Sequence, residues 1–338
     1  MNKGTIKTGI LSFGMSGKIF HSPFVNEHKD FELYAVVERT KKKAHLIYPN
    51  IKSYNSIEEL IADPEIELVI VNTPNITHFD FALKAIKAGK HVLMEKPFTV
   101  NSSEAGILFK EAKRYNCHIL PYQNRRYDSD FSSVKSVLNS GKLGRLVEFH
   151  LRYDRYKNII GHKIMKETPV PGSGLAYDLG PHLLDAVISV FGKPLEWRKK
   201  LGYFRPKTQV DDYAYFHLSY PNDFQVFITM SMLVSESQPA FVIHGTKGSY
   251  IKQRTDVQER QLTDGITPSN SLYGVEELGK HGVFTSFSND GVKIQEKILS
   301  PKSSYMQVFN DVYNTIREGK SYPVTENEIM LQLKILEG

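Results

Sequence analysis

The chain has 338 residues, of which 41 % are hydrophobic and 24 % charged, with a formal net charge of +6 and a single cysteine. This length predicts two domains, and the composition is that of an ordinary globular protein. No apolar run approaches the roughly 18 residues of a membrane helix, and one cysteine excludes an internal disulfide.

The positive charge is scattered, with Lys41-Lys42-Lys43 as its densest run. No nucleic-acid-binding motif accompanies it, so the charge favours a surface that attracts anionic ligands over nucleic-acid binding. Met1 to Thr5 lead into a strand pattern without the apolar segment of a signal peptide. With the single cysteine, Cys117, this predicts a cytoplasmic protein that has no nucleic-acid or membrane partner.

Residues 1–122 alternate between strand and helix patterns. Short apolar strands are expected at 6–11, 32–38, 51–54, 67–72, 91–94 and 118–122. A helix is expected from the first turn to about Glu27, and others after Ser56 and Asn101, where Glu follows three residues later as in a capping box. A further helix at 77–88 ends at a glycine. Repeated βα units predict a doubly wound sheet.

After residue 123 the pattern changes. A helix is expected near 130–140, and period-two alternation predicts strands at 146–156, 197–204, 213–220, 224–233, 241–244 and 292–299. A helix at about 181–191 interrupts these strands, residues 255–282 are expected to form an irregular loop, and Thr325 caps a closing helix.

The expected fold class is therefore α/β, with an N-terminal doubly wound Rossmann domain and a C-terminal α+β domain whose open sheet is large and mostly antiparallel. The expected domains are residues 1–122 for dinucleotide binding and 123–324 for substrate binding and oligomerisation. A C-terminal helix at 325–338 is expected to pack back on the body.

The turn after the first strand, Ser12-Phe13-Gly14-Met15-Ser16-Gly17, is close to the dinucleotide fingerprint Gly-x-Gly-x-x-Gly. Ser12 replaces the first glycine. Gly14 would let backbone N–H groups approach a pyrophosphate, and Gly17 would let the helix pack on the strand. The pattern favours a dinucleotide site over the alternative of a merely structural turn.

Glu38 follows Gly17 by 21 residues, near the distance at which an acid binds the ribose hydroxyls of NAD. The next residue, Arg39, could stack on the adenine or pair with a 2′-phosphate, and the second role would favour NADP. The choice between NAD and NADP therefore stays open. Thr73-Pro74-Asn75 forms a second loop at the same sheet edge, and His78 begins the next helix, where a surface or capping role is the alternative.

Lys96 follows the fifth strand within Glu95-Lys96-Pro97. Ligands bind outside the carboxyl ends of strands in open α/β sheets, and Pro97 restricts Lys96 to an extended backbone. Lys96 is therefore expected beside the cofactor, where it would hydrogen-bond the reacting oxygen. The alternative is a surface lysine before a loop.

Asp178 and His182 follow the glycine-rich Gly172-Ser173-Gly174, and Pro181 between them is expected in the first turn of a helix. Residues four apart share a helix face. Oxidation of an alcohol needs a group that takes the hydroxyl proton, which histidine does near neutral pH, and the carboxylate would orient it. Asp178 as an N-cap is one alternative. A zinc site with Asp185 is another, but no His/Cys cluster supports it, so no metal is expected.

Together, the fingerprint turn, Glu-Lys-Pro after the fifth strand and Asp-x-x-x-His after a glycine-rich loop resemble the glucose–fructose oxidoreductase/inositol dehydrogenase (Gfo/Idh/MocA) family over almost the whole chain. The resemblance implies reversible, NAD(P)-dependent hydride transfer at a secondary hydroxyl of a sugar or cyclitol, with Lys96, Asp178 and His182 as catalytic residues. It also implies a homodimer or homotetramer formed through the C-terminal sheet. Ser12 departs from the family pattern.

Two further segments, 123–131 and 153–156, resemble the branch that contains NADP-linked scyllo-inositol dehydrogenases. The alternative is that residues 127 and 131 belong to the core. The residues expected to bind the cofactor are then Ser12, Phe13, Gly14, Met15, Ser16, Gly17, Glu38, Arg39, Thr73, Pro74, Asn75, His78, Glu95, Lys96 and Asn124. Those expected near the substrate are Lys96, Arg126, Tyr153, Arg155, Tyr156, Asp178 and His182.

Two other functions remain as alternatives. An imine or other carbonyl reductase of the same family would keep the cofactor, but the Asp178/His182 pair disfavours it. A non-enzymatic NAD(P)-sensing regulator would keep the fold, but the retention of all three reactive residues disfavours it, and fold alone does not decide function.

Overall fold

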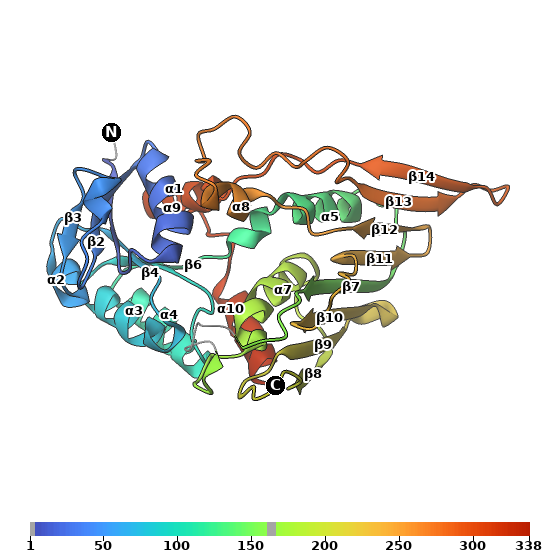
Figure 1. Ribbon diagram of the computed structural model, residues 1–338, viewed down its shortest axis with the longest axis horizontal. Coiled ribbons are helices and arrows are strands. Elements are labelled where there is room, and N and C mark those ends of the chain that lie inside the picture. The colour runs from blue at the N-terminus through green and yellow to red at the C-terminus, as the bar shows by residue number, and fades with distance from the viewer. Residues whose placement is uncertain (1–3, 161–166) are drawn as a thin grey trace. The chain divides into compact units, whose positions relative to one another are not determined.

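The computed structural model describes residues 4–160 and 167–338, which form two compact units (Figure 1). The first unit combines the stretch up to Asn124 with residues 258–273 and 304–330, and the second combines residues 125–257, 274–303 and 331–338. The domains expected from the sequence are continuous, whereas each unit contains three stretches. No helix among the described residues is both long and apolar enough to cross a membrane.

The first unit contains a six-stranded parallel sheet with the strand order β3-β2-β1-β4-β5-β6. Its strands are β1 (Ile6–Ile10), β2 (Phe31–Val37), β3 (Lys52–Tyr54), β4 (Leu68–Val71), β5 (His91–Met94) and β6 (Ile119–Pro121). This confirms the predicted doubly wound sheet. The order reverses between β1 and β4, and the carboxyl ends of strands at such a reversal form the usual ligand crevice.

Helices cover both faces of this sheet. The helices of the first unit include α1 (Ser22–Glu27), α2 (Ile57–Ala62), α3 (His78–Lys87), α4 (Ser102–Arg114) and α9 (Met306–Glu318), with the short turns η1 (Gly17–His21), η2 (Ala44–Leu46) and η3 (Asn75–Thr77). A further helix, α8 (Gln258–Thr263), lies against η1. Figure 1 shows α3 and α4 together on one side of the sheet and α1 with α9 on the other. Phe24 of α1 stacks on Phe309 of α9, with ring centroids 5.5 Å apart.

Local side-chain caps begin several helices where the sequence predicts them. Ser56 Oγ accepts from the backbone N–H of Glu59, and Asn101 Oδ1 accepts from that of Glu104. Thr325 Oγ1 accepts from the N–H of Glu328, whose carboxylate accepts from the N–H of Thr325, so this capping box is complete. It begins α10 (Glu326–Glu337).

The second unit contains an eight-stranded sheet with the order β14-β13-β12-β11-β7-β10-β9-β8. Its strands are β7 (Leu146–Asp154), β8 (Glu196–Gly202), β9 (Tyr213–Ser219), β10 (Gln225–Ser231), β11 (Phe241–Gly245), β12 (Gly248–Lys252), β13 (Gly282–Phe287) and β14 (Lys293–Ile298). Only the β7–β10 pair of this sheet is parallel among the described strands, which confirms the mostly antiparallel sheet. The helical elements of this unit include α5 (Ser129–Asn139), α7 (Leu175–Phe191), η4 (Asn124–Tyr127, whose first residue belongs to the first unit) and η5 (Pro221–Asp223).

The start of α7 differs from the prediction. The helix begins at Leu175, so Pro181 lies inside it, and the expectation of Pro181 in the first turn and the N-cap alternative for Asp178 are both wrong. Asp211 determines this start, because its carboxylate accepts from the N–H of Ala176 (2.7 Å) and its carbonyl from that of Leu175 (3.0 Å). Gly174 precedes the helix with φ = 87°, and a Cβ there would lie 2.0 Å from Asp211 Oδ1.

Helix α7 packs on one face of the second sheet, against β7, β9 and β10 (Figure 1). Phe191 of α7 meets Phe149 of β7 edge to face, with centroids 5.7 Å apart. Side chains alternate along a strand, so β7 residues next to Phe149 and Leu151 point to the opposite face. The helix that bears Asp178 and His182 is therefore held against a broad apolar surface.

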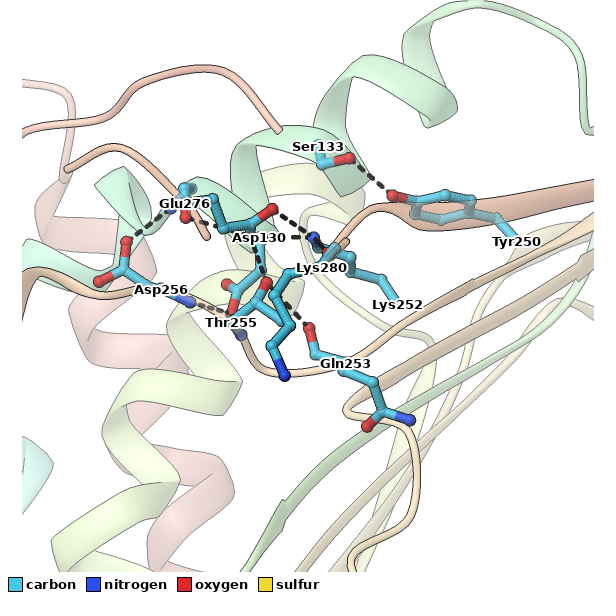
Figure 2. A network of polar contacts seen from close by, with 10 residues as sticks. Asp130, Ser133, Tyr250, Lys252, Gln253, Thr255, Asp256, Glu276 and Lys280 are labelled. Atoms are coloured by element: carbon cyan, nitrogen blue, oxygen red, sulfur yellow. Dashed lines mark hydrogen bonds and ion pairs between the residues drawn. The ribbon is translucent and has the colours of Figure 1, made fainter. Parts of the chain in front are cut away.

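A buried polar network lies beside α5 (Figure 2). Lys252 is 1 % exposed, and its Nζ donates to both carboxylate oxygens of Glu276, each at 2.9 Å, and to the carbonyl of Lys280. Asp130 Oδ2 accepts from the N–H groups of Thr255 and Asp256. Buried ions require such pairing, and the result is a fixed path for residues 252–256, which begin at the last residue of β12.

The sequence did not predict several elements between 245 and 318. β12, α9 and the strand β13 were not expected, and α8 lies within 255–282, which was expected to be an irregular loop. β12 is only five residues long and includes the buried Lys252 at a position where a strand facing a core is normally apolar. In the sheet, β12 pairs antiparallel with β11 on one side and with β13 on the other.

Candidate active site

The turn between β1 and the first helix has the geometry of a cradle for a ligand. A Cβ on Gly17 would lie 2.1 Å from the carbonyl oxygen of Ser12, so only glycine fits there. At Gly14 the protein leaves room, since a Cβ would meet only Ser12 Oγ, at 3.5 Å. The exposed Gly14 and Met15 precede a helix whose residues 17–21 form a π-helical turn, a feature often found at functional sites.

Asn72, directly after β4, connects two strand ends at the point where the strand order reverses. Its Nδ2 donates to the carbonyl of Ser12 at 2.9 Å. Its Oδ1 is buried without a hydrogen-bond partner among the residues that the structure describes. An orphaned acceptor beside a glycine cradle fits a bound polar group such as a dinucleotide, so the residues present fit the cofactor that the fold implies.

Glu95 lies at the end of β5 and connects it to the first helix. Its Oε1 accepts from Ser16 Oγ at 2.7 Å and lies 2.9 Å from His21 Nε2, while its Oε2 accepts from the backbone N–H of Lys96 at 3.1 Å. Burial raises the pKa of this carboxyl, but the hydrogen bond and charge of His21, the Ser16 hydroxyl and the Lys96 charge outweigh burial and lower it to about 2. The Lys96–Pro97 peptide bond that follows is cis.

His78 is buried at the start of α3, so the surface alternative for this residue is wrong. Its Nδ1 lies 2.8 Å from the carbonyl of Pro97, and its Nε2 lies 2.9 Å from that of Thr73. Burial lowers its pKa, opposed by these two carbonyls and Glu95. The imidazole thus links the loops after β4 and β5, and its contacts within the protein are those of a positioning residue.

Glu38, the acid expected to bind the ribose, is already engaged within the protein. It is 8 % exposed, and its carboxylate accepts from the backbone N–H groups of Lys43 (2.7 Å) and Ala44 (3.2 Å) and from Ser53 Oγ (3.0 Å). Arg39 beside it is exposed. The strand end therefore presents a cation to solvent, while the anion is directed inward.

The other expected cofactor residues occupy the same sheet edge of the first unit. Thr73 and Thr77 hydroxyls lie 2.7 Å apart, and Thr77 donates to the carbonyl of Pro74, which closes the loop that includes Asn75. Phe13 is buried in the first turn, and Asn124 is buried at the start of η4. Within this unit, residues from the ends of β1, β4 and β5 are connected by the hydrogen bonds of Asn72, His78 and Glu95.

In the second unit, one face of α7 carries Asp178, His182 and Asp185. Asp178 is half-buried, with an oxygen 3.7 Å from Nη1 of Arg155. His182, one turn later, is 9 % exposed and lines a small pocket together with Arg125, Asp128 and Arg254. The pocket thus combines an imidazole with two guanidinium groups, a set that can hold a polar substrate and accept a proton.

Arg126 and Asp185 form a buried bidentate ion pair. Nε and Nη2 of Arg126 each donate at 2.8 Å to a different carboxylate oxygen of Asp185. This pairing uses the fork of the guanidinium, so Asp185 is a partner of Arg126 rather than a metal ligand. Across the described residues, no group of three His, Cys, Asp or Glu side chains is arranged to hold a metal ion.

The three residues expected near the substrate at the end of β7 differ in exposure. Tyr156 is 59 % exposed, whereas Tyr153 is half-buried and Arg155 lies over its ring at 4.9 Å from the centroid. Burial raises the pKa of the Tyr153 hydroxyl, but the positive charges of Arg125, Arg254 and Arg155 outweigh it and lower the pKa overall. Tyr153 is therefore the centre of a positively charged cluster.

Sequence reasoning missed Arg125, Arg254, Asp211, Asn72 and His21. Arg125 adjoins residues that the resemblance did identify, and Asn72 ends a predicted strand at a sheet edge, so position alone was a usable signal for both. The roles of Arg254 and Asp211 come from contacts across 35 residues or more of chain. Lys96 belongs to the first unit, and Asp178 and His182 to the second, so their convergence on one substrate stays a prediction.

We expect the Glu95→Gln substitution to remove a pH-dependent part of the stability. The wild-type carboxyl titrates at about 2 when folded against 4.5 ordinarily, so its stabilisation is present above pH 4.5 and is lost as the pH falls toward 2. The lowered pKa corresponds to roughly 3 kcal/mol. Urea unfolding at pH 7 and pH 3 measures this. The gap between wild type and variant should shrink at pH 3, and an equal gap at both pH values would contradict it.

Comparison with known proteins agrees with this geometry. Residues 6–123 match the model of the Gfo/Idh/MocA oxidoreductase family with its NAD-binding Rossmann fold, and residues 131–251 match the model of the Gfo/Idh/MocA C-terminal domain. The uncharacterized oxidoreductase C115.03 of Schizosaccharomyces pombe is 36 % identical, over 98 % of this chain and 96 % of its own length. The scyllo-inositol 2-dehydrogenase (NADP(+)) IolW of Bacillus subtilis is 31 % identical, over 99 % and 92 %.

A solved structure leads to the same assignment. The crystal structure of an oxidoreductase from Bacillus cereus superimposes with a TM-score of 0.90 at 30 % identity, covering 98 % of this chain and 95 % of that one. The cradle after β1, the strand reversal beside it and the histidine-bearing helix on an open sheet thus occur in a chain that matches the family in both sequence and fold. This chain belongs to the Gfo/Idh/MocA family of NAD(P)-binding oxidoreductases.

Proposed function

We propose that this oxidoreductase is a dehydrogenase that transfers hydride reversibly between NAD(P) and a secondary hydroxyl of a sugar or cyclitol. The observation that carries the proposal is the pair Asp178 and His182 on one face of α7, with His182 opening into a pocket of the second unit. Support also comes from the relative IolW, which is named a scyllo-inositol 2-dehydrogenase (NADP(+)). The single cysteine fits a reducing cytoplasm, which we propose as its location.

The roles of the residues follow from their chemistry. The bound nicotinamide supplies the hydride acceptor. Lys96 would donate a hydrogen bond to the substrate hydroxyl oxygen and stabilise negative charge as it develops there. His182 would take the hydroxyl proton at a ring nitrogen, and return it in the reverse direction. Asp178, one helical turn away, would orient the imidazole and favour its protonated form.

The engaged state of Glu38 favours NADP over NAD. A ribose 2′-hydroxyl needs an acceptor, but the Glu38 carboxylate already accepts from two backbone N–H groups and a serine hydroxyl. The exposed Arg39 is suited to a 2′-phosphate, since a guanidinium binds phosphate through paired donors. We therefore assign the 2′-phosphate of NADP to Arg39.

A row of rings on the sheet face opposite α7 supports a homo-oligomer formed through that face. Phe227 stacks between His150 (4.8 Å) and His217 (4.9 Å), on three neighbouring strands. These positions alternate with the buried residues that face α7. A wide sheet face with a central aromatic residue suits a self-complementary contact.

We expect Lys96→Ala to retain cofactor binding but to lose turnover by about 100-fold or more, the scale of general acid–base contributions. Turnover is measured by reduced-nicotinamide absorbance on a panel of sugars and cyclitols, and binding by nucleotide fluorescence. Lys110→Ala, which changes an exposed lysine of α4, is the matched control. Near-normal turnover of Lys96→Ala would argue strongly against the proposed chemistry, and tight cofactor binding without turnover of any alcohol or imine by the wild type would favour a regulator.

We expect the wild type to bind NADP at least about 10-fold more tightly than NAD, and Arg39→Ala to abolish most of that difference, since a charged hydrogen bond contributes about 1.5–3 kcal/mol. Titration of both nucleotides against both proteins measures this. Lys87→Ala, on the exposed face of α3, controls for the loss of surface charge. A variant that weakens NAD and NADP equally would contradict the assignment.

We expect the protein to be an oligomer in solution and Phe227→Glu to shift it toward the monomer, because the substitution introduces a charge into the centre of the contact. Light scattering coupled to size exclusion measures the mass. Ile107→Glu adds the same charge at an exposed position of α4 and should leave the mass unchanged. A monomeric wild type, or an unchanged mass for Phe227→Glu, would contradict the contact.

A further inference from the structure

Three guanidinium groups of the second unit converge on the ring of Tyr153. Arg254 lies 4.4 Å from the ring centroid, Arg155 4.9 Å and Arg125 5.9 Å. They come from distant parts of the chain: Arg254 follows β12, Arg155 follows β7, and Arg125 lies in the turn η4. Because like charges this close repel one another, such a cluster requires compensation.

Carboxylates lie near two of the three guanidinium groups. An oxygen of Asp128 lies 3.3 Å from Arg125, and one of Asp178 lies 3.7 Å from Arg155. Burial, followed by the charge of Asp256, raises the pKa of Asp128 well above its ordinary range despite Arg125. Two carboxylates thus lie beside three guanidinium groups.

Arg254 makes fewer hydrogen bonds to the described residues than its guanidinium N–H donors allow. Its Nη2 donates to the carbonyl of Arg152 at 3.0 Å, and a guanidinium carries five N–H donors. Among the described ion pairs, none joins Arg254 to a carboxylate. The guanidinium also lies 5.3 Å from the centroid of the Phe241 ring, so the rings of Tyr153 and Phe241 both contact it.

Two members of the cluster line the same pocket as His182. Arg125, Arg254 and His182 line that pocket together with Asp128, and its remaining walls are apolar: Phe131, Leu151, Leu183, Ala186 and Phe241. A pocket lined by two guanidinium groups and by an imidazole that can act as a general base is suited to a molecule that carries both an anionic group and a reactive hydroxyl.

Contacts within the protein hold the backbone around Arg254 in place without a ligand. The network beside α5 holds the residues on either side of it: Lys252 through Glu276, and Thr255 and Asp256 through Asp130 (Figure 2). Such support keeps a binding group in place before the ligand arrives and reduces the entropy lost on binding.

We propose that Arg125, Arg155 and Arg254 bind an anionic group of the substrate, a carboxylate or a phosphate ester, while its hydroxyl lies at His182. The inference rests on the proposed dehydrogenase function and narrows it, because the substrate becomes a sugar or cyclitol acid or phosphate rather than a neutral polyol. Guanidinium forks match both anions.

The test uses matched sets of glucose, galactose and mannose: the neutral sugar, its uronate and its 6-phosphate, with inorganic phosphate as a probe that lacks a sugar. Equilibrium binding is measured by calorimetry on the NADP-loaded protein, and hydride transfer by absorbance. We expect inorganic phosphate and at least one anionic sugar to bind, that sugar about 10- to 100-fold more tightly than its neutral parent. The uronate and 6-phosphate arms distinguish the two anions.

Arg254→Gln should abolish most of this preference, and Arg254→Lys, which keeps the charge without the fork, should restore part of it. Arg145→Gln is the control, because it removes an exposed charge before β7, eight residues and roughly 25 Å from Tyr153. Melting temperatures confirm that each variant folds.

Several results would overturn the inference: no binding by any anionic probe, equal binding of neutral and anionic sugars, or an Arg254→Gln variant that loses NADP affinity instead of anion affinity. An anion preference that depends on Arg254 without any hydride transfer would leave the inference standing and refute the dehydrogenase proposal. If the wild type and Arg254→Gln turn over neutral polyols equally well, the dehydrogenase proposal stands and the inference of an anion site is refuted.

Discussion

The half-buried carboxylate of Glu95 holds the end of β5 in a defined relation to the first helix, and the cofactor side of the site depends on it. A carboxylate with little exposure is costly unless it is fully hydrogen-bonded, and here Ser16, His21 and the Lys96 backbone satisfy it. The same bonds fix the backbone from which the Lys96 side chain extends. A residue first considered for cofactor contact thus positions the lysine that follows it.

The second unit uses a similar arrangement on α7. Asp211 and Gly174 determine where the helix begins, and the helical repeat then places Asp178, His182 and Asp185 on adjoining turns. Arg126 pairs with Asp185 in the interior, whereas Arg155 lies near the more exposed Asp178. The start of the helix therefore places Asp185 where it pairs with Arg126 in the interior, and Asp178 one turn before His182.

Short sequence patterns predict those parts of the structure that depend on interactions between residues close together in the sequence. The helix caps at Ser56, Asn101 and Thr325 involve residues three apart, and the buried strands of the first sheet read as apolar runs. The start of α7 was missed because its cap, Asp211, lies 35 residues farther along the chain. The inward turn of Glu38 was missed for the same reason, since Ser53 and the 43–44 amides are not adjacent to it in sequence.

Charge distinguishes the two sides of the proposed chemistry. On the first unit the cradle at Gly14 and Gly17 offers backbone groups and little side-chain charge, which suits a pyrophosphate. On the second, three guanidinium groups surround one tyrosine, and His182 opens into the pocket that two of them line. A general base gains positive charge when it takes a proton, and the positive charges of the two arginines that line its pocket would oppose that step. A bound anionic substrate would offset the positive charge of the arginines. Binding of such a substrate would therefore also favour the transfer of the hydroxyl proton to His182.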